Sequence, residues 1–216
     1  MTNQLVGWRG PLHGEPLTLI LLRHGVTAST LDKLFCGSGG SDPGLVPEGE
    51  AQARRAAEHL AARGGIDAVI ASPLRRTQET AGVVAEALGL DVTTEPLLAE
   101  AAFGEWDGHS FAEIMGRWPT ELDAWLASTA VAPPSGETFD AVAERTAQLQ
   151  QQLVEQHAGQ TIVAVSHVTP IKMMTRLALG APIDVIYRME LAPASLTTIV
   201  WWPDGTPSLR SFSVTP

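Results

Sequence analysis

Three apolar stretches of the sequence are each followed by histidine or arginine, residue types that can bind and react with an oxyanion such as phosphate. The stretches and the side chains after them are residues 17–22 with Arg23 and His24, residues 161–166 with His167, and residues 67–72 with Arg75 and Arg76. A guanidinium pairs with phosphate oxygens, and an imidazole can act as nucleophile, base or metal ligand. Because parallel strands present their carboxyl ends on the same side of a sheet, we expect these side chains to converge on one site.

The elements that must position these side chains follow from the apolar pattern. Each apolar stretch has the length and character of a strand buried in a sheet. Apolar residues then recur at helical spacing over residues 48–63, and a second helix is predicted from Pro73, at its first position, to about Leu88. This alternation of strand and helix predicts an α/β fold, a three-layer sandwich in which a mostly parallel central sheet carries helices on both faces.

The rest of the chain predicts further helices, a loop and a pair of strands. Helices are predicted over residues 110–128 with a break at Pro119, over residues 138–157, and from Pro170 to Leu179; residues 35–44 form a loop and residues 185–214 form strands with a turn at 203–205. We expect the aromatic side chains of residues 110–128 to pack in the interior rather than to bind a ligand.

The length and the first residues of the chain predict one domain behind a tail. The chain has 216 residues, 44% of them hydrophobic, which suffices for one substantial core. Residues 1–16 hold several glycines and prolines without periodicity, and they predict an N-terminal tail or linker ahead of a domain at residues 17–216. A linker in that place raises the hypothesis that the chain was cut from a longer protein.

The composition excludes several classes of protein. The formal net charge of −10 disfavours nucleic acid or an anionic membrane as a direct partner. Cys36 is the single cysteine, so an internal disulfide framework and a cysteine-rich zinc site are excluded, and histidine and carboxylate side chains show no metal-ligand spacing on a helix face. No signal peptide pattern or membrane-length apolar run is seen, so we expect a cytoplasmic protein. The oligomeric state is left open.

Four motifs together carry a family resemblance. They are Arg23-His24-Gly25, Ser-Pro-Leu-Arg-Arg at residues 72–76, Glu100 ahead of Phe-Gly-Glu-Trp-Asp-Gly at residues 103–108, and Val-Ser-His ending at His167. In combination they resemble the histidine phosphatase superfamily, the phosphoglycerate-mutase-like group. The resemblance covers about residues 17–213 and lies on the acid phosphatase and α-ribazole phosphatase side, including the phosphatase half of actinobacterial fusions with a ribonuclease H domain.

The resemblance implies a role for each of five residues. His24 is implied to be the nucleophile, Arg23 and Arg76 to bind phosphate, Glu100 to donate a proton, and His167 to be the second histidine of the site. General chemistry agrees, since a neutral imidazole can attack phosphorus and a carboxyl group can protonate the leaving oxygen. Both arginines and a protonated His167 would hold the phosphoryl oxygens, so neither a metal nor a cofactor is expected.

The sequence departs from the family pattern at three positions. Thr30 stands where asparagine is frequent, Val168 where glycine usually follows the second histidine, and Thr138 where serine is frequent. Thr30 keeps a hydroxyl group and is predicted to contact phosphate together with Val168, although a valine raises a question about the local backbone. His109, which lies near the expected site loop, is a weaker candidate for ligand contact, and Arg75 is expected to be solvated.

The sequence therefore predicts a phosphomonoester hydrolase that acts on a small phosphorylated metabolite through a phosphohistidine at His24. A phosphoglycerate-type mutase would share the same residues, but it usually needs additional basic residues. The chain has only 14 Lys and Arg, and none lies in residues 77–116. A catalytically silent binding domain of the same fold is the other alternative, and the five retained residues argue against it. A serine hydrolase is disfavoured because Ser166 lacks the G-x-S-x-G elbow.

Overall fold

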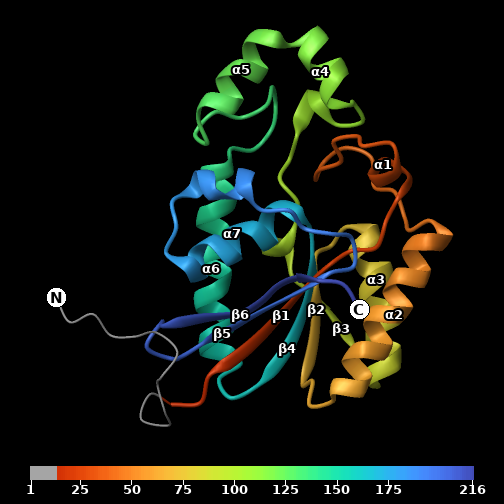
Figure 1. Ribbon diagram of the computed structural model, residues 1–216, viewed down its shortest axis with the longest axis vertical. Coiled ribbons are helices and arrows are strands. Elements are labelled where there is room, and N and C mark those ends of the chain that lie inside the picture. The colour runs from red at the N-terminus through yellow and green to blue at the C-terminus, as the bar shows by residue number, and fades with distance from the viewer. Residues whose placement is uncertain (1–13) are drawn as a thin grey trace.

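A computed structural model of the chain, which describes residues 14–216, contains one six-stranded sheet in the order β3-β2-β4-β1-β5-β6 (Figure 1). The strands are β1 (Leu17–Arg23), β2 (Ala68–Ala71), β3 (Val92–Thr94), β4 (Thr161–Ser166), β5 (Leu196–Trp201) and β6 (Pro207–Val214). The first four are parallel to one another, whereas β5 pairs antiparallel with β1 and β6 pairs antiparallel with β5. The predicted mostly parallel sheet is confirmed. Most of the predicted tail, residues 1–13, lies outside the described residues.

Helices cover both faces of this sheet, as predicted. The helices are α1 (Ala28–Leu31), α2 (Pro47–Arg63), α3 (Arg75–Leu88), α4 (Phe111–Arg117), α5 (Pro119–Ala127), α6 (Phe139–Gln156) and α7 (Val168–Leu179), with 3-10 turns at Pro96–Leu98, Gly104–Trp106 and Ile183–Arg188. Helices α2 and α3 pack on one face, and α6 and α7 pack on the other (Figure 1). Alternate side chains of β1 supply both cores: Leu19 and Leu21 face α6 and α7, while Ile20 and Leu22 face α2 and α3.

A third apolar cluster lies beyond the carboxyl ends of the strands. Helices α4 and α5 stand there above the sheet (Figure 1), and Trp106, Trp125 and Phe139 form the cluster with neighbouring aliphatic residues. The break predicted at Pro119 is confirmed, because this proline begins α5. The expected packing of Phe111 is wrong: this residue begins α4 and is 46% exposed, since the helix buries only Ile114.

Two predicted helix starts are displaced by two residues. Helix α3 begins at Arg75 rather than at Pro73, because the chain bends at Pro73 and Asp42 from a distant loop accepts the hydrogen bond of the Arg75 N–H. Helix α7 begins at Val168, which leaves Pro170 as its third residue. A proline is tolerated there because first-turn N–H groups have no acceptor within the helix. Within residues 14–216, no helix is long and apolar enough to cross a membrane.

The strand ends lie level with one another, and this alignment defines the functional edge of the sheet. The register pairs Arg23 with Ser166 and Ala71 with Val165. The next residue of β1, His24, still donates its backbone N–H to the Ser166 carbonyl. The chain therefore leaves each of the three strands at the same edge.

Candidate active site

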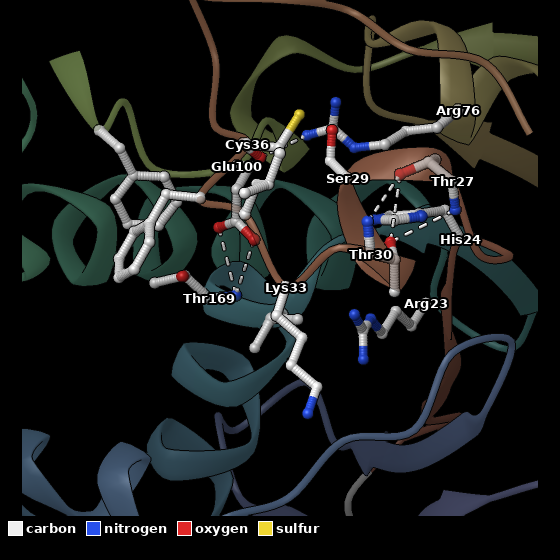
Figure 2. Close-up of a pocket in the computed structure, with 14 residues that line it drawn as sticks. Arg23, His24, Thr27, Ser29, Thr30, Lys33, Cys36, Arg76, Glu100 and Thr169 are labelled. Carbon is white, nitrogen blue, oxygen red and sulfur yellow. Dashed lines mark hydrogen bonds between the residues drawn. The ribbon is translucent and has the colours of Figure 1, made fainter. Parts of the chain in front are cut away.

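A pocket of about 320 Å³ opens at this edge, between the strand ends and α1 (Figure 2). Six of the seven predicted site residues line it: Arg23, His24, Thr30, Arg76, Glu100 and Val168. The seventh, His167, is not in the pocket wall. Its ring is fully buried, with its centroid 5.2 Å from the centroid of the His24 ring. The structure thus brings all seven residues to one place.

His24 is held as a neutral imidazole with one nitrogen free. Its Nδ1–H donates to the carbonyl of Gly25 at 2.7 Å, so Nε2 carries the lone pair. Burial, followed by the positive charges of Arg76 and Arg23, holds the pKa of His24 well below its usual value. Gly25 is required by close packing, since a Cβ at this position would lie 2.4 Å from the carbonyl oxygen of Gly49. His24 can therefore act as a nucleophile through Nε2.

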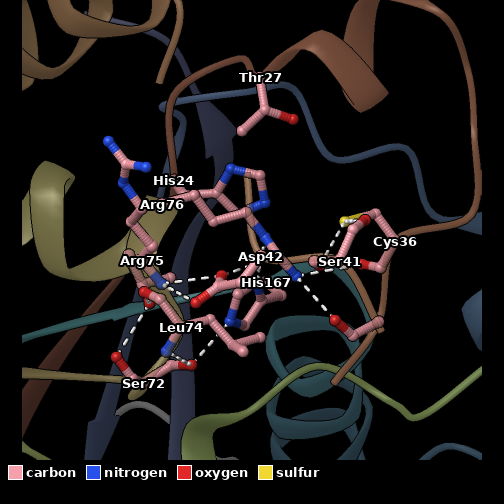
Figure 3. A network of polar contacts seen from close by, with 12 residues as sticks. His24, Thr27, Cys36, Ser41, Asp42, Ser72, Leu74, Arg75, Arg76 and His167 are labelled. Carbon is pink, nitrogen blue, oxygen red and sulfur yellow. Dashed lines mark hydrogen bonds and ion pairs between the residues drawn. The ribbon is translucent and has the colours of Figure 1, made fainter. Parts of the chain in front are cut away.

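His167 is also neutral, which corrects the expectation of a protonated ring. Burial is the largest cause that holds the pKa of His167 well below its usual value, followed by the repulsion that two protonated rings at sites 24 and 167 would have and by the charge of Arg76. Arg76 Nε–H donates to His167 Nδ1 at 3.3 Å, so the ring proton lies on Nε2 and is donated to Ser72 Oγ at 2.8 Å (Figure 3). A second proton on the ring would point at a guanidinium, and this arrangement disfavours it.

Each of the two arginines keeps a buried N–H group that makes no hydrogen bond. Arg76 donates through Nη2 to the carbonyl of Cys36 at 3.0 Å, and its Nη1 lies 3.7 Å from an Asp42 carboxylate oxygen without a hydrogen bond. Arg23 donates through Nη1 to the carbonyl of Leu191, whereas its buried Nε has no partner. The pKa of Arg23 is lowered to about 10, mainly by burial and also by the charge of Arg76, while the charge of Glu100 acts in the opposite direction. Both arginines line the same pocket, and two guanidinium groups at one pocket suit an oxyanion.

Glu100 faces the same pocket and is fixed by backbone donors. Its side chain is buried, and one carboxylate oxygen accepts the Ala101 N–H at 2.8 Å. Both oxygens lie within hydrogen-bond distance of the Thr169 N–H in the first turn of α7, at 3.2 and 3.3 Å (Figure 2). This position places a proton-transfer group across the pocket from the arginines.

Two of the three departures from the family pattern, Thr30 and Val168, line the pocket and fit the local backbone. Thr30 belongs to a capping box: its hydroxyl accepts the Thr27 N–H, while the Thr27 hydroxyl accepts the Thr30 N–H. Val168 begins α7 directly after His167, and its φ is not in the positive range that would favour glycine. A valine therefore causes no backbone strain at this position.

Several sequence expectations about other residues can now be judged. His109 does not line the pocket; its ring lies against Trp118, and its Nε2 is 3.1 Å from Arg117 Nη1, so ligand contact is not supported. Arg75 is exposed and pairs with Glu79, as expected. Among residues 14–216, no group of three or more histidine, cysteine or acidic side chains is placed to hold a metal ion.

Two residues at the site were missed in the sequence. The Ser72 hydroxyl accepts the hydrogen bond of the His167 ring. Ser72 stands at the end of a predicted strand in the Ser-Pro-Leu-Arg-Arg motif, and this position could have marked it as a site residue. Lys33 lines the pocket from the turn after α1, where no periodic pattern exists to mark it.

Comparisons with known proteins agree with this geometry. The family model described as "Histidine phosphatase superfamily (branch 1)" matches residues 19–215. A bifunctional protein of Mycobacterium tuberculosis is 44% identical over 204 residues, which cover 94% of this chain and 55% of that protein. The chain thus spans about half the length of the first curated relatives that it matches.

Shorter relatives and solved structures match over most of their length. Phosphoserine phosphatase 1 of Hydrogenobacter thermophilus is 31% identical over 182 residues, covering 84% of this chain and 85% of that protein. A 2,3-bisphosphoglycerate-dependent phosphoglycerate mutase of Bartonella quintana is 29% identical, covering 92% and 98%. The α-ribazole phosphatase of Shigella flexneri has a TM-score of 0.82 at 27% identity, covering 92% and 96%. Phosphoserine phosphatase of Entamoeba histolytica, in complex with 3-phosphoglyceric acid, has a TM-score of 0.81 at 30% identity, covering 92% and 98%.

Proposed function

The chain belongs to the histidine phosphatase superfamily, and we propose that it hydrolyses phosphomonoesters of small metabolites through a covalent phosphohistidine at His24. One observation carries this proposal: a neutral, buried imidazole with a free Nε2 lies beside two guanidiniums that keep unsatisfied N–H groups. The pocket of about 320 Å³ suits a small ester rather than a macromolecular surface.

In the first step, His24 Nε2 attacks phosphorus as the bond from phosphorus to the ester oxygen breaks. Arg23 and Arg76 stabilise the charge on the non-bridging oxygens, and Glu100 transfers its proton to the departing alkoxide. In the second step, the Glu100 carboxylate takes a proton from water, the water oxygen attacks phosphorus, and the bond to His24 breaks. Phosphate then leaves and the neutral imidazole is restored.

Glu100 must carry a proton in the first step, and in the structure its oxygens accept hydrogen bonds from the N–H groups of Ala101 and Thr169. A bound phosphate dianion adds negative charge in the same pocket. We therefore assign the protonation of Glu100 to the substrate complex.

The other predicted residues receive supporting roles in the proposal. His167 orients the Arg76 guanidinium through Nδ1 and packs against the His24 ring, so it acts as a positioning residue in the neutral form. Thr30 and Val168 contribute to the wall around the phosphate. The cationic groups come from side chains, so the proposal needs neither metal nor cofactor.

The remaining proposals concern the context of the domain. We assign residues 17–216 to the phosphatase domain, and residues 1–16 stay predicted as a tail or linker. A net charge of −10 gives no support to direct nucleic-acid binding, and the local pair of Arg23 and Arg76 can attract a small phosphorylated substrate against it. A lone cysteine fits a cytoplasmic location.

The test is a screen of small phosphate esters with the His24→Ala variant as the matched control. We expect phosphate release by the wild-type protein alone, together with a transient acid-labile label on the wild type and none on the variant. Release of phosphate at equal rates by both proteins would contradict the proposal. Absence of both release and label would favour the silent binding domain.

A phosphoglycerate-type mutase is the second candidate, and the similarity to the Bartonella quintana mutase is the observation that favours it. Adding a bisphosphorylated glycerate to the assay separates the two functions. A mutase would transfer the phosphoryl group between hydroxyl groups only with this cofactor, whereas a hydrolase would release phosphate without it.

A further inference from the structure

We propose that Lys33 recognises a second negatively charged group on the alcohol part of the substrate. The preferred esters would then carry a carboxylate or a second phosphate in addition to the phosphoryl group that reacts. This inference rests on the proposed hydrolase function and assigns its substrate class.

Lys33 is the third cationic side chain that lines the pocket, and its polar contacts differ from those of the two arginines. Arg23 and Arg76 donate hydrogen bonds to the backbone carbonyls of Leu191 and Cys36. Lys33 lines the same pocket from the turn after α1, and no carboxylate pairs with it anywhere in residues 14–216 (Figure 2). Another lysine, Lys172, is half-buried and already donates to the carbonyl of Ile186 at 3.0 Å, so its ammonium is engaged.

The backbone conformation at Lys33 supports a functional role for its side chain. Its φ is 55°, directly after the Asp32 that caps α1. Glycine or asparagine usually occupies this left-handed position after a helix, because other side chains are strained there. A strained residue that faces a pocket is a mark of functional sites.

The other residues of the pocket wall restrict which part of a ligand can lie near Lys33. Phe35 and Phe103 form an apolar wall, with their ring centroids 4.9 Å apart. The hydroxyl-bearing Ser29 and Thr30 stand on the same segment as Lys33. A small ester bound at His24 shares a pocket of about 320 Å³ with these residues and with the Lys33 side chain, whose flexible stem allows its ammonium to turn toward the alcohol part.

The experiment compares two esters that differ in one group. 3-Phosphoglycerate and glycerol 3-phosphate have the same carbon chain, but only the first has a carboxylate in place of a hydroxymethyl group. We expect wild-type kcat/KM to be about fivefold higher for 3-phosphoglycerate, the factor that an exposed ion pair supplies. Propane-1,3-diol bisphosphate against 3-hydroxypropyl phosphate repeats the comparison for a second phosphate.

Three variants of Lys33 and one control variant separate charge recognition from a structural role. Lys33→Met should reduce the ratio of kcat/KM values between 3-phosphoglycerate and glycerol 3-phosphate about fivefold, and Lys33→Arg should keep this ratio. Lys33→Gly should also lose the preference and unfold at a temperature at least as high as the wild type, because glycine relieves the strain. Arg63→Met removes one positive charge from the end of α2 and should change neither ester.

The outcomes distinguish this inference from the proposed function. If wild type hydrolyses both esters but Lys33→Met leaves their ratio unchanged, the role of Lys33 is wrong and the phosphatase proposal stands. An equal loss for both esters in Lys33→Met would assign Lys33 a structural role and overturn the inference. If the wild type hydrolyses no ester and His24 takes up no label, the proposed function fails and the inference fails with it.

Discussion

Acidification is expected to destabilise the folded protein through the two histidines of the site. Burial is the largest cause that holds the pKa values of His24 and His167 well below their usual range, and the nearby positive charges add to it. Both rings are almost inaccessible, with 6% of His24 and 0% of His167 exposed, so solvent screening gives little relief. In the unfolded chain both rings would titrate near the ordinary histidine pKa of about 6.5.

The sign and size of the effect follow from proton linkage. Below about pH 6.5 the unfolded chain takes up protons that the folded chain refuses, so the free energy of unfolding falls as the pH falls. Between about pH 7.5 and about pH 5.5, each neutral buried histidine lowers the free energy of unfolding by about 1.4 kcal/mol, and the pair by about 3 kcal/mol. Above about pH 7.5 both forms of the chain hold neutral imidazoles, and this contribution to stability is fully present.

Urea unfolding followed by tryptophan fluorescence measures this dependence. The buffers should contain no phosphate, because phosphate binding would stabilise the folded form. His24→Ala is expected to halve the loss of stability between the two pH values, whereas His59→Ala, which changes an exposed histidine of α2, should leave it intact. The reasoning is refuted if wild type and His24→Ala lose the same free energy over this window.

Two further predictions concern the acid group and a loop contact. Glu100→Gln should lower the steady-state rate by about 10² or more for alkyl phosphates, because their leaving group needs a proton. The loss should be much smaller for 4-nitrophenyl phosphate, whose leaving group does not need one. Equal losses for both substrates would exclude the acid role. Asp42→Ala should cost about 1 kcal/mol of stability in urea unfolding, because it removes the acceptor of the Arg75 N–H at the start of α3, and Asp42→Asn should recover part of it. Identical stability of the alanine and asparagine variants would contradict this capping role.

The parts of the site that could be predicted are those fixed by regular elements. The apolar runs that end at Arg23 and Ser166 are buried on both faces of the sheet, and such burial leaves a clear pattern in the sequence. Their register then places His24 and His167 together without any further information. Arg76 follows because α3 begins just after β2 at the same edge.

The parts that could not be predicted depend on contacts between distant segments. The start of α3 is set by Asp42, which is 33 residues away in the chain. The turn at Lys33 follows a helix of only four residues, too short to show a periodic pattern. The neutral state of His167 depends first on the full burial of its ring and then on the cations around it, and a sequence gives neither.

The positive charges of the site affect both the binding of the substrate and the protonation of the nucleophile, His24. Arg23 and Arg76 each lower the pKa of His24, and Arg76 lowers that of Arg23, so these like charges repel one another in the pocket. A phosphate dianion would offset this repulsion when it binds, and the same charges keep His24 neutral before it arrives. The nucleophile is therefore expected to stay unprotonated well below about pH 6.5, where an ordinary histidine would be cationic. Removing Arg76 would weaken phosphate binding and would also make His24 easier to protonate, so one substitution should affect both properties together.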